Sequence, residues 1–393
     1  MIGEFLGVGL LFSVGDEHKR LRRIVAGPLS RPSVRRLSPV FLTQATKLCS
    51  DIEHALEKDG TNTVEIEPLI TKAALDVIGV SLLGQEMHRV RSPTSPWTYE
   101  ECYQKILSPP KLGQFIMFIN PFIPLRWIPV KANRDYLSAK AWLEQMMIEL
   151  IESRTAQIME SKKPDEESLE PRDFLSRMIE ASMAADQKLT KRQLIDITLQ
   201  SIAAGHDTTA SGLTWAMYSL AVHTDVQDRL RKEILEARLT EANFSLVDDL
   251  PYLNNVVRES LRLYSPALMS PWQAAKDLVI VGVHVPKGTI VQTVPATIQR
   301  NPQIWGEDAD SFKPDRWDNL KEGALSPFAF EPFINGPRMC PGKALALLEM
   351  KVLLVEVIRK FAVEATVKDL GFLNPSLTLK PKESLRLKMR RLN

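Results

Sequence analysis

The 393-residue sequence has little of several features that would quickly assign a protein to a class. Its three cysteines, Cys49, Cys102 and Cys340, form no CxxC pair, which argues against a disulfide framework or a closed zinc site and indicates a reducing compartment. Lys and Arg total 50 and Asp and Glu total 48, so the net charge of +2 gives no global basic field for nucleic acid. No window approaches 18 uninterrupted apolar residues, the minimum for a transmembrane helix.

The apolar run at residues 1–14 contains Glu4 and is too short to cross a bilayer. It lacks the positively charged region and the small-residue cleavage site of a signal peptide. We therefore expect this run to be a buried loop or the entry to a helix, and not a membrane anchor.

The spacing of apolar residues predicts helices in most of the first 220 residues and short strands after residue 266. Helical spacing occurs at residues 16–60, 65–84, 133–160, 189–221 and 343–361. The helices are interrupted by a Pro-rich and aromatic stretch at 107–130 and by a polar loop at 161–172. Strands are expected at 277–285 and 289–294. They are followed by a Pro-rich meander at 301–341. Because no repeat or linker separates these parts, residues 1–393 are predicted to form one mainly α domain with a smaller β region.

The strongest chemical pattern lies just before the helix expected at 343–361. Within ten residues it places Phe333, Gly336, Arg338, Cys340 and Gly342. A cysteine at a helix N-terminus has its thiolate favoured by the helix dipole and by unpaired N–H groups. Glycine allows a tight bend or the close approach of a flat group, and arginine can grip a carboxylate. These residues suit a haem ligated by cysteine, whereas Cys49 and Cys102 are predicted to be buried, inert thiols.

This segment resembles the haem-binding loop FxxGxRxCxG of the cytochrome P-450 family, with every fixed position present. The resemblance extends from about residue 7 to about residue 388. Within the family, the sequence is similar to the eukaryotic branch and particularly to its fungal members. It implies haem b with Cys340 as the axial ligand of the iron, in a mainly α fold with a smaller β region. It also implies a single haem-binding domain over residues 1–393 that lacks the N-terminal strands and first helices of the family.

Residues 204–209 (AGHDTT) fall in the helix predicted at 189–221 and match the family's AGxDTT segment. A glycine in mid-helix costs about 1 kcal/mol, and we expect Gly205 to let the helix distort and leave room beside the metal. The resemblance assigns Asp207 and Thr208 to proton delivery during catalysis and Ala204 to the surroundings of the cofactor. Alternatively, these polar side chains only bond to backbone carbonyls or face water.

Three charged residues are expected to support the haem site rather than to catalyse. Glu259 and Arg262 lie three apart on one helix face and match the ExxR motif of the family. Arg316 lies in the segment FKPDRW, which resembles the family's PERF motif. An isolated ion pair of this kind is usually a surface contact of little value, but in the resembled family the three residues form a buried network beneath the cysteine loop.

Near the start of the chain, GDEHKRLRR resembles the WxxxR helix of the family, with His18 where Trp is commoner. His18 and Arg22 would share a helix face and could both donate to a haem propionate, although a basic solvated face is the alternative. The sequence departs from the family at Trp272, where an arginine usually binds a propionate, because Trp donates one hydrogen bond and carries no charge.

The candidates for the substrate pocket are mostly small or apolar, which predicts a hydrophobic substrate. They are Gln200, Ala203, Ala267, Leu268, Met269 and Leu377.

By resemblance, the reaction inserts one atom of O₂ into a hydrophobic organic substrate and reduces the other to water. Electrons would come from NADPH through a reductase, and the protein is expected to be a monomer that binds no nucleic acid. The full-length parent would reside in the endoplasmic reticulum membrane, whereas this chain shows no anchor. Two alternatives stay open: a truncated, catalytically impaired haem-binding relative, or a member with non-monooxygenase chemistry, against which the intact Asp207 and Thr208 argue.

Overall fold

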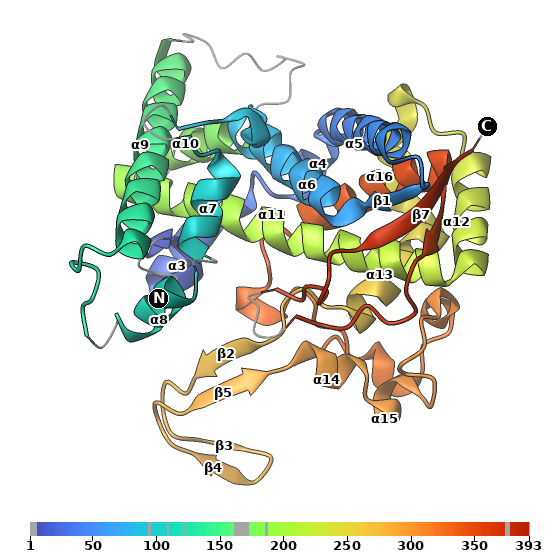
Figure 1. The fold of residues 1–393 in the computed structure, drawn as a ribbon. Helices are drawn as coiled ribbons and strands as arrows, with labels where there is room; N and C mark the ends of the chain where they lie inside the picture. The colour runs from blue at the N-terminus through green and yellow to red at the C-terminus, as the bar shows by residue number, and fades with distance from the viewer. Residues whose placement is uncertain are drawn as a thin grey trace. The chain divides into compact units, whose positions relative to one another are not determined.

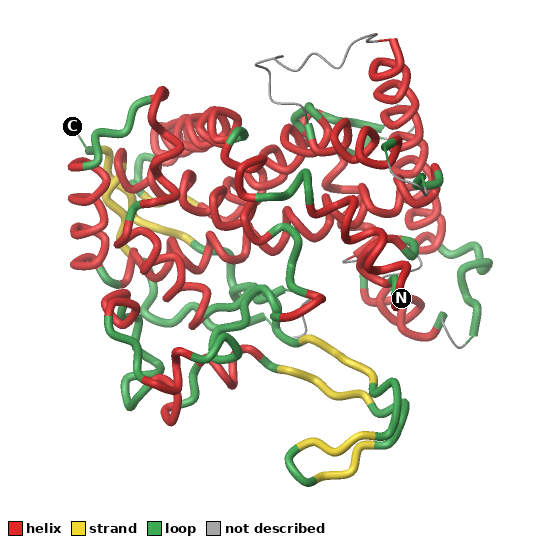
Figure 2. Tube along the Cα trace, turned by 180° about the vertical axis from the view of Figure 1, so that it is seen from behind, coloured by secondary structure: helices red, strands yellow, loops and turns green. Residues whose placement is uncertain are grey.

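The computed structural model describes residues 6–92, 96–107, 110–120, 123–160, 173–184, 188–373 and 378–392. Its contacts divide the chain into two compact units. The first unit comprises residues 1–40 and 74–206, and the second comprises residues 41–73 and 207–393. Helices predominate, and the named strands within the described residues all belong to the second unit (Figure 2). The loop expected at 161–172 and the pocket candidate Leu377 lie outside the described residues.

The first unit is built from helices. They are α2 (Gly9–Phe12), α3 (Gly15–Ala26), α4 (Arg31–Arg35), the 3₁₀ turn η1 (Met87–Arg89), α7 (Tyr99–Leu107), α8 (Lys111–Ile119), α9 (Lys131–Glu160) and α10 (Phe174–Met183). The long helix α9 packs against α7, α8 and α10, and α3 packs against α10 (Figure 1). Leu143, Met147 and Ile151 of α9 are buried and lie four residues apart, which is the apolar stripe of an amphipathic helix.

Two long helices are each divided between the units. α6 (Ile66–Leu83) is divided between residues 73 and 74, and α11 (Lys191–Val222) is divided between residues 206 and 207. Residues 38–40 of α5 (Ser38–Asp59) also belong to the first unit. The AGHDTT segment therefore starts in the first unit and ends in the second.

The second unit contains the buried helix α16 and several further helices. They are α5 (Ser38–Asp59), α12 (Thr224–Glu236), η2 (Glu241–Asp249), α13 (Pro251–Leu263), α14 (Pro295–Gln299), α15 (Pro302–Trp305), η3 (Pro314–Asp318), η4 (Glu322–Leu325), η5 (Gly336–Arg338) and α16 (Lys343–Lys360). Residues 348–358 of α16 are all buried, and the helix packs against α12, α13 and η2. A helix that is buried on every side forms the centre of a core.

Three small antiparallel sheets belong to the second unit (Figure 1). The largest has the order β1 (Thr63–Glu65), β7 (Arg386–Arg391), β6 (Phe361–Ala365), with Val64 opposite Leu387 and Val363 opposite Met389. The other two pair β2 (Ser270–Gln273) with β5 (Ile290–Thr293) and β3 (Leu278–Ile280) with β4 (Val283–Val285). The strands expected at 277–285 and 289–294 are confirmed.

The predicted helices are confirmed as α6, α9, α11 and α16, and residues 16–60 form α3, α4 and α5. The break expected at 107–130 is wrong in part, because α8 forms inside it. Pro110 is the N-cap of α8, so the proline precedes the helix, where its missing N–H costs nothing, instead of interrupting it.

The expectation for the N-terminal run is half right. Leu6 is buried and α2 leads directly into α3, as expected for an entry to a helix. Val8, Leu11, Phe12 and Val14 are between 41% and 74% exposed, so the run as a whole is not a buried loop. Among the described residues, no helix combines the length and the apolarity that crossing a bilayer requires.

Candidate functional site

The loop at residues 333–342 is closed by backbone hydrogen bonds immediately before α16. The N–H of Cys340 donates to the carbonyl of Phe333 at 2.8 Å, and the N–H of Met339 donates to that of Gly336 at 3.0 Å. Gly336 has φ +73°, a conformation that other residues adopt only with strain, and open space surrounds its α-carbon. The predicted tight bend is confirmed, and it places the Cys340 thiol two residues before the helix-capping Gly342.

The three cysteines lie in different environments. Cys49 and Cys102 are buried, and desolvation raises the pKa of their thiols to about 12 and about 11. The predicted burial is confirmed, and the raised pKa favours the protonated thiol near neutral pH, which agrees with the prediction that both are inert. Cys340 is partly exposed, as a thiol must be if it is to meet a ligand from outside the loop.

Glu259 and Arg262 form a fully buried ion pair on α13. The Arg262 guanidinium donates to both carboxylate oxygens, through Nε at 2.9 Å and Nη2 at 2.8 Å. Glu259 also accepts the N–H of Lys313 at 3.0 Å, the indole N–H of Trp317 at 3.0 Å and Nε–H of Arg316 at 3.3 Å. A buried carboxylate is tolerated only when donors surround it in this way, so the burial expected for these residues is confirmed.

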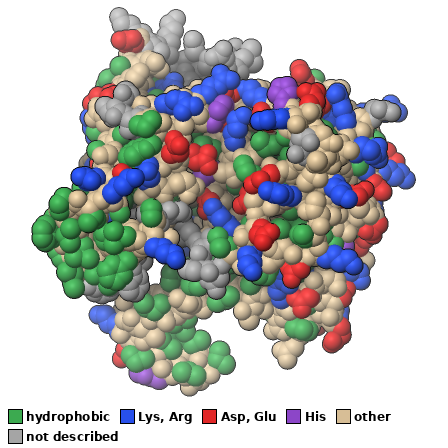
Figure 3. Space-filling model, viewed as in Figure 1, with side chains coloured by type: hydrophobic (Ala, Val, Ile, Leu, Met, Phe, Trp, Pro, Cys, Tyr) green, Lys and Arg blue, Asp and Glu red, His purple; other side chains and the backbone are tan. Residues whose placement is uncertain are grey.

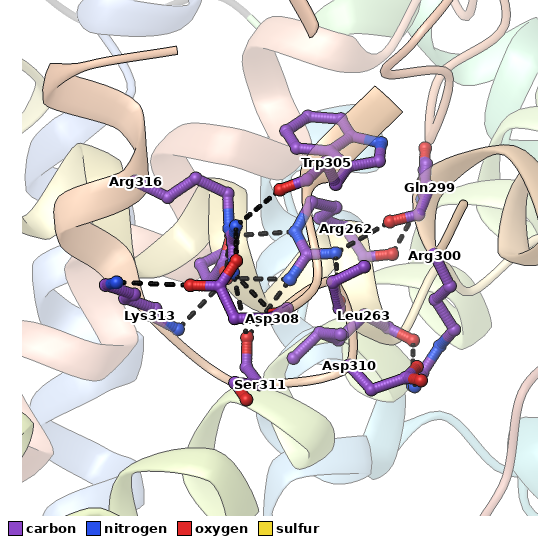
Figure 4. A network of polar contacts seen from close by, with 12 residues as sticks. Arg262, Leu263, Gln299, Arg300, Trp305, Asp308, Asp310, Ser311, Lys313 and Arg316 are labelled. Atoms are coloured by element: carbon purple, nitrogen blue, oxygen red, sulfur yellow. Dashed lines mark hydrogen bonds and ion pairs between the residues drawn. The ribbon is translucent and has the colours of Figure 1, made fainter. Parts of the chain in front are cut away.

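Arg316 connects this pair to the Pro-rich meander (Figure 4). Its Nη1 donates to the Asp308 carboxylate at 2.7 Å and to the Trp305 carbonyl at 2.9 Å, and its Nη2 donates to the Asp308 carbonyl at 2.8 Å. Hydrogen bonds from Arg316 and then Lys313 lower the pKa of Asp308 to about 2. The side chains of Arg316 and Glu259 are 8% and 0% exposed, so their ion pair is shielded from solvent, whereas the Asp308 side chain is 40% exposed.

The network extends toward the cysteine loop through Gln299, which no sequence motif marked (Figure 4). Arg262 Nη1 donates to the Gln299 carbonyl at 2.7 Å, and the Gln299 carboxamide donates back to the Arg262 carbonyl at 2.9 Å. The same carboxamide accepts the N–H of Glu331 at 2.8 Å, two residues before Phe333. Buried Gln299 therefore ties the start of the loop to the ion pair.

Asp207 is held by a segment that is distant in the sequence. Lys380 Nζ lies 2.9 Å from one carboxylate oxygen, and the Thr378 hydroxyl donates to the other at 2.7 Å. Thr378 forms a β-bridge with Ala267 in the loop after α13. The second unit thus brings Asp207 near the pocket candidates Ala267, Leu268 and Met269, and the Met269 side chain is 51% exposed.

Four further predicted residues lie in the first unit. His18 is buried on α3, and Arg22 is partly exposed one turn later, which confirms their shared helix. On α11, Ala203 is buried and its carbonyl accepts the Tyr103 hydroxyl at 3.2 Å, whereas Ala204 is exposed.

The structure shows the contacts of two other predicted residues of α11. A Cβ at Gly205 would lie 2.5 Å from Cδ1 of Ile78, so this glycine permits close packing with α6, and helical residues continue on both sides of it. The Gln200 carboxamide bonds to the backbone of Leu6 and Leu11 in the N-terminal run, so it is occupied by the protein itself.

Comparison with known proteins agrees with these features. The family model for cytochrome P-450 matches residues 2–389. The chain belongs to the cytochrome P-450 family. It is 29% identical to cytochrome P-450 monooxygenase ptmK of Penicillium ochrochloron, covering 98% of this chain and 77% of that protein. It is 30% identical to monooxygenase 205 of Postia placenta and to sphH of Aspergillus fumigatus, covering 93% and 97% of this chain and 72% of each relative.

The mostly helical architecture with small sheets is the cytochrome P-450 fold. The protein is a haem-thiolate monooxygenase of fungal type, which uses O₂, a redox partner and a hydrophobic substrate.

The residues of the cysteine loop fit haem. The loop offers one partly exposed thiol, as a haem-thiolate centre requires. A Cβ at Gly342 would lie 3.8 Å from the Cys340 sulfur, so glycine keeps the surroundings of the thiol clear for a flat group. Among the described residues, no cluster of His, Cys, Asp and Glu could hold a separate metal ion.

Proposed function

We propose that Cys340 is the axial ligand of the haem iron and that residues 333–342 are its cofactor loop. The observation that carries this proposal is the partly exposed thiol in a closed loop at the start of α16. The positive end of the α16 dipole favours the thiolate over the thiol. Bound there, haem supplies the iron at which O₂ is activated.

The other residues of the loop shape the cofactor contact. Gly336 provides the bend, Gly342 leaves room at the sulfur, and Phe333 accepts the bond that closes the loop. Arg338 carries the charge that would pair with a propionate. Glu259, Arg262 and Arg316 keep the loop in place through Gln299 and do not touch the reacting atoms.

In the first unit, we assign His18 and Arg22 to a haem propionate, since both are donors on one face of α3. Ala204 is assigned to the cofactor contact, because its small exposed side chain lets a flat group approach α11. Trp272 lies on β2, where it offers an indole N–H but no charge.

Asp207 and Thr208 are proposed to deliver protons during oxygen activation. The Asp207 carboxylate is 13% exposed, so it can take up a proton from solvent, and Thr208 follows it directly with a hydroxyl that can pass the proton on. Lys380 and Thr378 hold the carboxylate in a defined orientation at α11.

The substrate pocket is proposed to include Ala203, Ala267, Leu268 and Met269. Leu377, which lies outside the described residues, is also assigned to it. Gln200 is assigned to the pocket through the backbone N–H of Leu11, to which its carboxamide is bonded. Their mostly apolar character supports a hydrophobic substrate.

We further propose that residues 1–393 act as one haem-binding domain, a monomer that receives electrons from an NADPH-dependent reductase. The full-length parent is assigned to the endoplasmic reticulum membrane. Exposed apolar side chains gathered over α8 and the segment after it support a membrane contact (Figure 3). They are Leu112, Phe115, Ile123 and Trp127, between 53% and 78% exposed.

The test is a CO-difference spectrum of the purified chain after reduction with dithionite. We expect a Soret band at the thiolate position, its loss in Cys340→Ala, and its retention in the control Cys49→Ala. A Cys340→Ala variant that kept the band would overturn the ligand assignment, and a wild-type chain without it would overturn haem-thiolate activity in this chain.

A further inference from the structure

Asn335 and Gly336 lie next to each other in the cysteine loop, and no other asparagine of the sequence precedes a glycine. Because glycine has no side chain to shield its backbone nitrogen, this nitrogen can attack the carboxamide of a preceding asparagine. Gly336 is exposed, and a Cβ built on it would meet nothing within 4 Å. Among the described residues, none accepts a hydrogen bond from its N–H. The nucleophile and the space for a cyclic product are thus both present.

The Asn335 carboxamide joins the cysteine loop to the segment before it. Its Nδ2 donates to the Pro327 carbonyl at 2.6 Å and to Oε1 of Glu331 at 3.2 Å. The backbone N–H of Glu331 in turn donates to Gln299, which is bonded to the buried Arg262. Both bonds of Asn335 therefore depend on the amino group that deamidation removes.

The residue before Asn335 is strained. Ile334 has φ +58°, a left-handed conformation that a β-branched side chain adopts only where its surroundings impose it. The N–H of Ile334 donates to the Glu331 carbonyl at 3.2 Å, and the N–H of Cys340 donates to the Phe333 carbonyl at 2.8 Å and closes the loop. Since these bonds and those of Asn335 oppose the strain together, loss of the Asn335 bonds allows the loop to relax and open.

We propose that Asn335 is a site of spontaneous deamidation and that its product opens the cysteine loop. The Gly336 nitrogen gives up its proton and bonds to Cγ of Asn335. The bond between Cγ and Nδ2 breaks, and the nitrogen leaves as ammonia with a proton in place of the lost bond. Water then opens the cyclic imide at one of its two carbonyls and yields aspartate or isoaspartate. The sequence of steps consumes water and needs no oxidant or reductant.

Either product disturbs the loop in a way that the contacts define. A carboxylate cannot donate to the Pro327 carbonyl, and it places a negative charge beside the Glu331 carboxylate. Isoaspartate also adds a backbone carbon inside the ring that the bond between Cys340 and Phe333 closes. The modification site goes beyond the proposed function, and only its effect on haem rests on Cys340 as the ligand.

Peptide mapping by mass spectrometry tests the modification on the purified, haem-loaded protein during incubation at mildly alkaline pH. The peptide with Asn335 is expected to gain the mass that separates a hydroxyl from an amino group, and to become a substrate for isoaspartyl methyltransferase. Asn319 is the internal control, since it is exposed but precedes Leu320. We expect Asn335 to convert about tenfold faster than Asn319 and the variant Asn335→Gln to stay unmodified there. Conversion of Asn335 no faster than that of Asn319 would overturn the proposal.

Hydrogen exchange at the Cys340 amide tests the opening of the loop. It is measured in Asn335→Asp, which reproduces one product, and in the wild-type protein after incubation. The matched control Asn319→Asp adds the same charge outside the loop. We expect exchange to rise about tenfold in Asn335→Asp and in the modified wild-type fraction, and to stay unchanged in the control. Unchanged exchange in both would contradict the proposal.

Haem content per chain provides a separate readout, and it is expected to fall with the rise in exchange. A wild-type chain that lacks the thiolate Soret band would overturn the proposed function, whereas the mass and exchange measurements would still decide whether Asn335 is modified and whether the loop opens.

Discussion

The role of Arg316 can be tested by its replacement with alanine. The change removes the charge-assisted hydrogen bonds to Glu259 and Asp308 and the bonds to the carbonyls of Trp305 and Asp308. Glu259 is fully buried and keeps Arg262, Trp317 and the Lys313 N–H as hydrogen-bond donors. Its negative charge loses one of its two arginine partners.

Removing one partner of a buried ion pair costs about 3–5 kcal/mol. The lower end applies here, because Arg262 still pairs with Glu259 and because Asp308 is 40% exposed and its contribution is screened by solvent. A loss of about 3 kcal/mol is a large share of the roughly 5–15 kcal/mol that stabilises a typical domain. Since the network holds the start of the cysteine loop through Gln299, haem retention is expected to fall with stability.

The assay combines urea unfolding with haem content per chain, measured as the pyridine haemochromogen. The matched control is Asp315→Ala, which removes the neighbouring surface pair with Arg229, whose side chains are 48% and 53% exposed. We expect the control to lose less than about 1 kcal/mol and to keep its haem. An Arg316→Ala protein with normal haem content, CO spectrum and unfolding free energy would refute the structural role.

Two further substitutions probe groups elsewhere in the second unit. The buried Glu349 carboxyl has no hydrogen-bond partner within the described residues, and desolvation raises its pKa above the usual 4.5. The folded state therefore keeps a proton that the unfolded chain releases, so stability falls above pH 4.5 by up to about 1.4 kcal/mol per pH unit. Glu349→Gln should abolish this slope in urea unfolding at pH 5 and pH 7, and an unchanged slope would contradict the assignment. Asp207→Asn keeps an oxygen for the Thr378 hydroxyl but cannot carry the proton, so turnover should fall about 100-fold or more with unchanged haem content, whereas normal turnover would exclude a proton-relay role.

The sequence was sufficient for features that depend on neighbouring residues. The cysteine loop is specified within ten positions, because a glycine bend and a helix start are local properties, and the structure has both. The three-residue spacing of Glu259 and Arg262 puts both on one helix face, and the pair forms as expected. The inert character of Cys49 and Cys102 followed from the lack of chemical neighbours in the sequence.

Contacts between distant segments were decided by the tertiary structure. Gln299 and Asp308 complete the network around Arg262 and Arg316, although no motif marks either residue. The partners of Asp207 lie more than 170 residues away, and which lysine reaches it depends on how the C-terminal segment packs on α11.

Gln200 also combines a feature that the sequence predicts with contacts that only the tertiary structure shows. Its place on α11 was predicted from helical spacing, but its bonds to the N-terminal run were not. Helix position follows from short-range periodicity in the chain, which any stretch of sequence displays by itself. The hydrogen-bond partner of a side chain is a group that tertiary packing places within about 3 Å of it. Which group that is depends on the whole fold. The sequence by itself therefore determined the family and the cysteine chemistry, whereas only the tertiary structure decided which polar groups support and orient them.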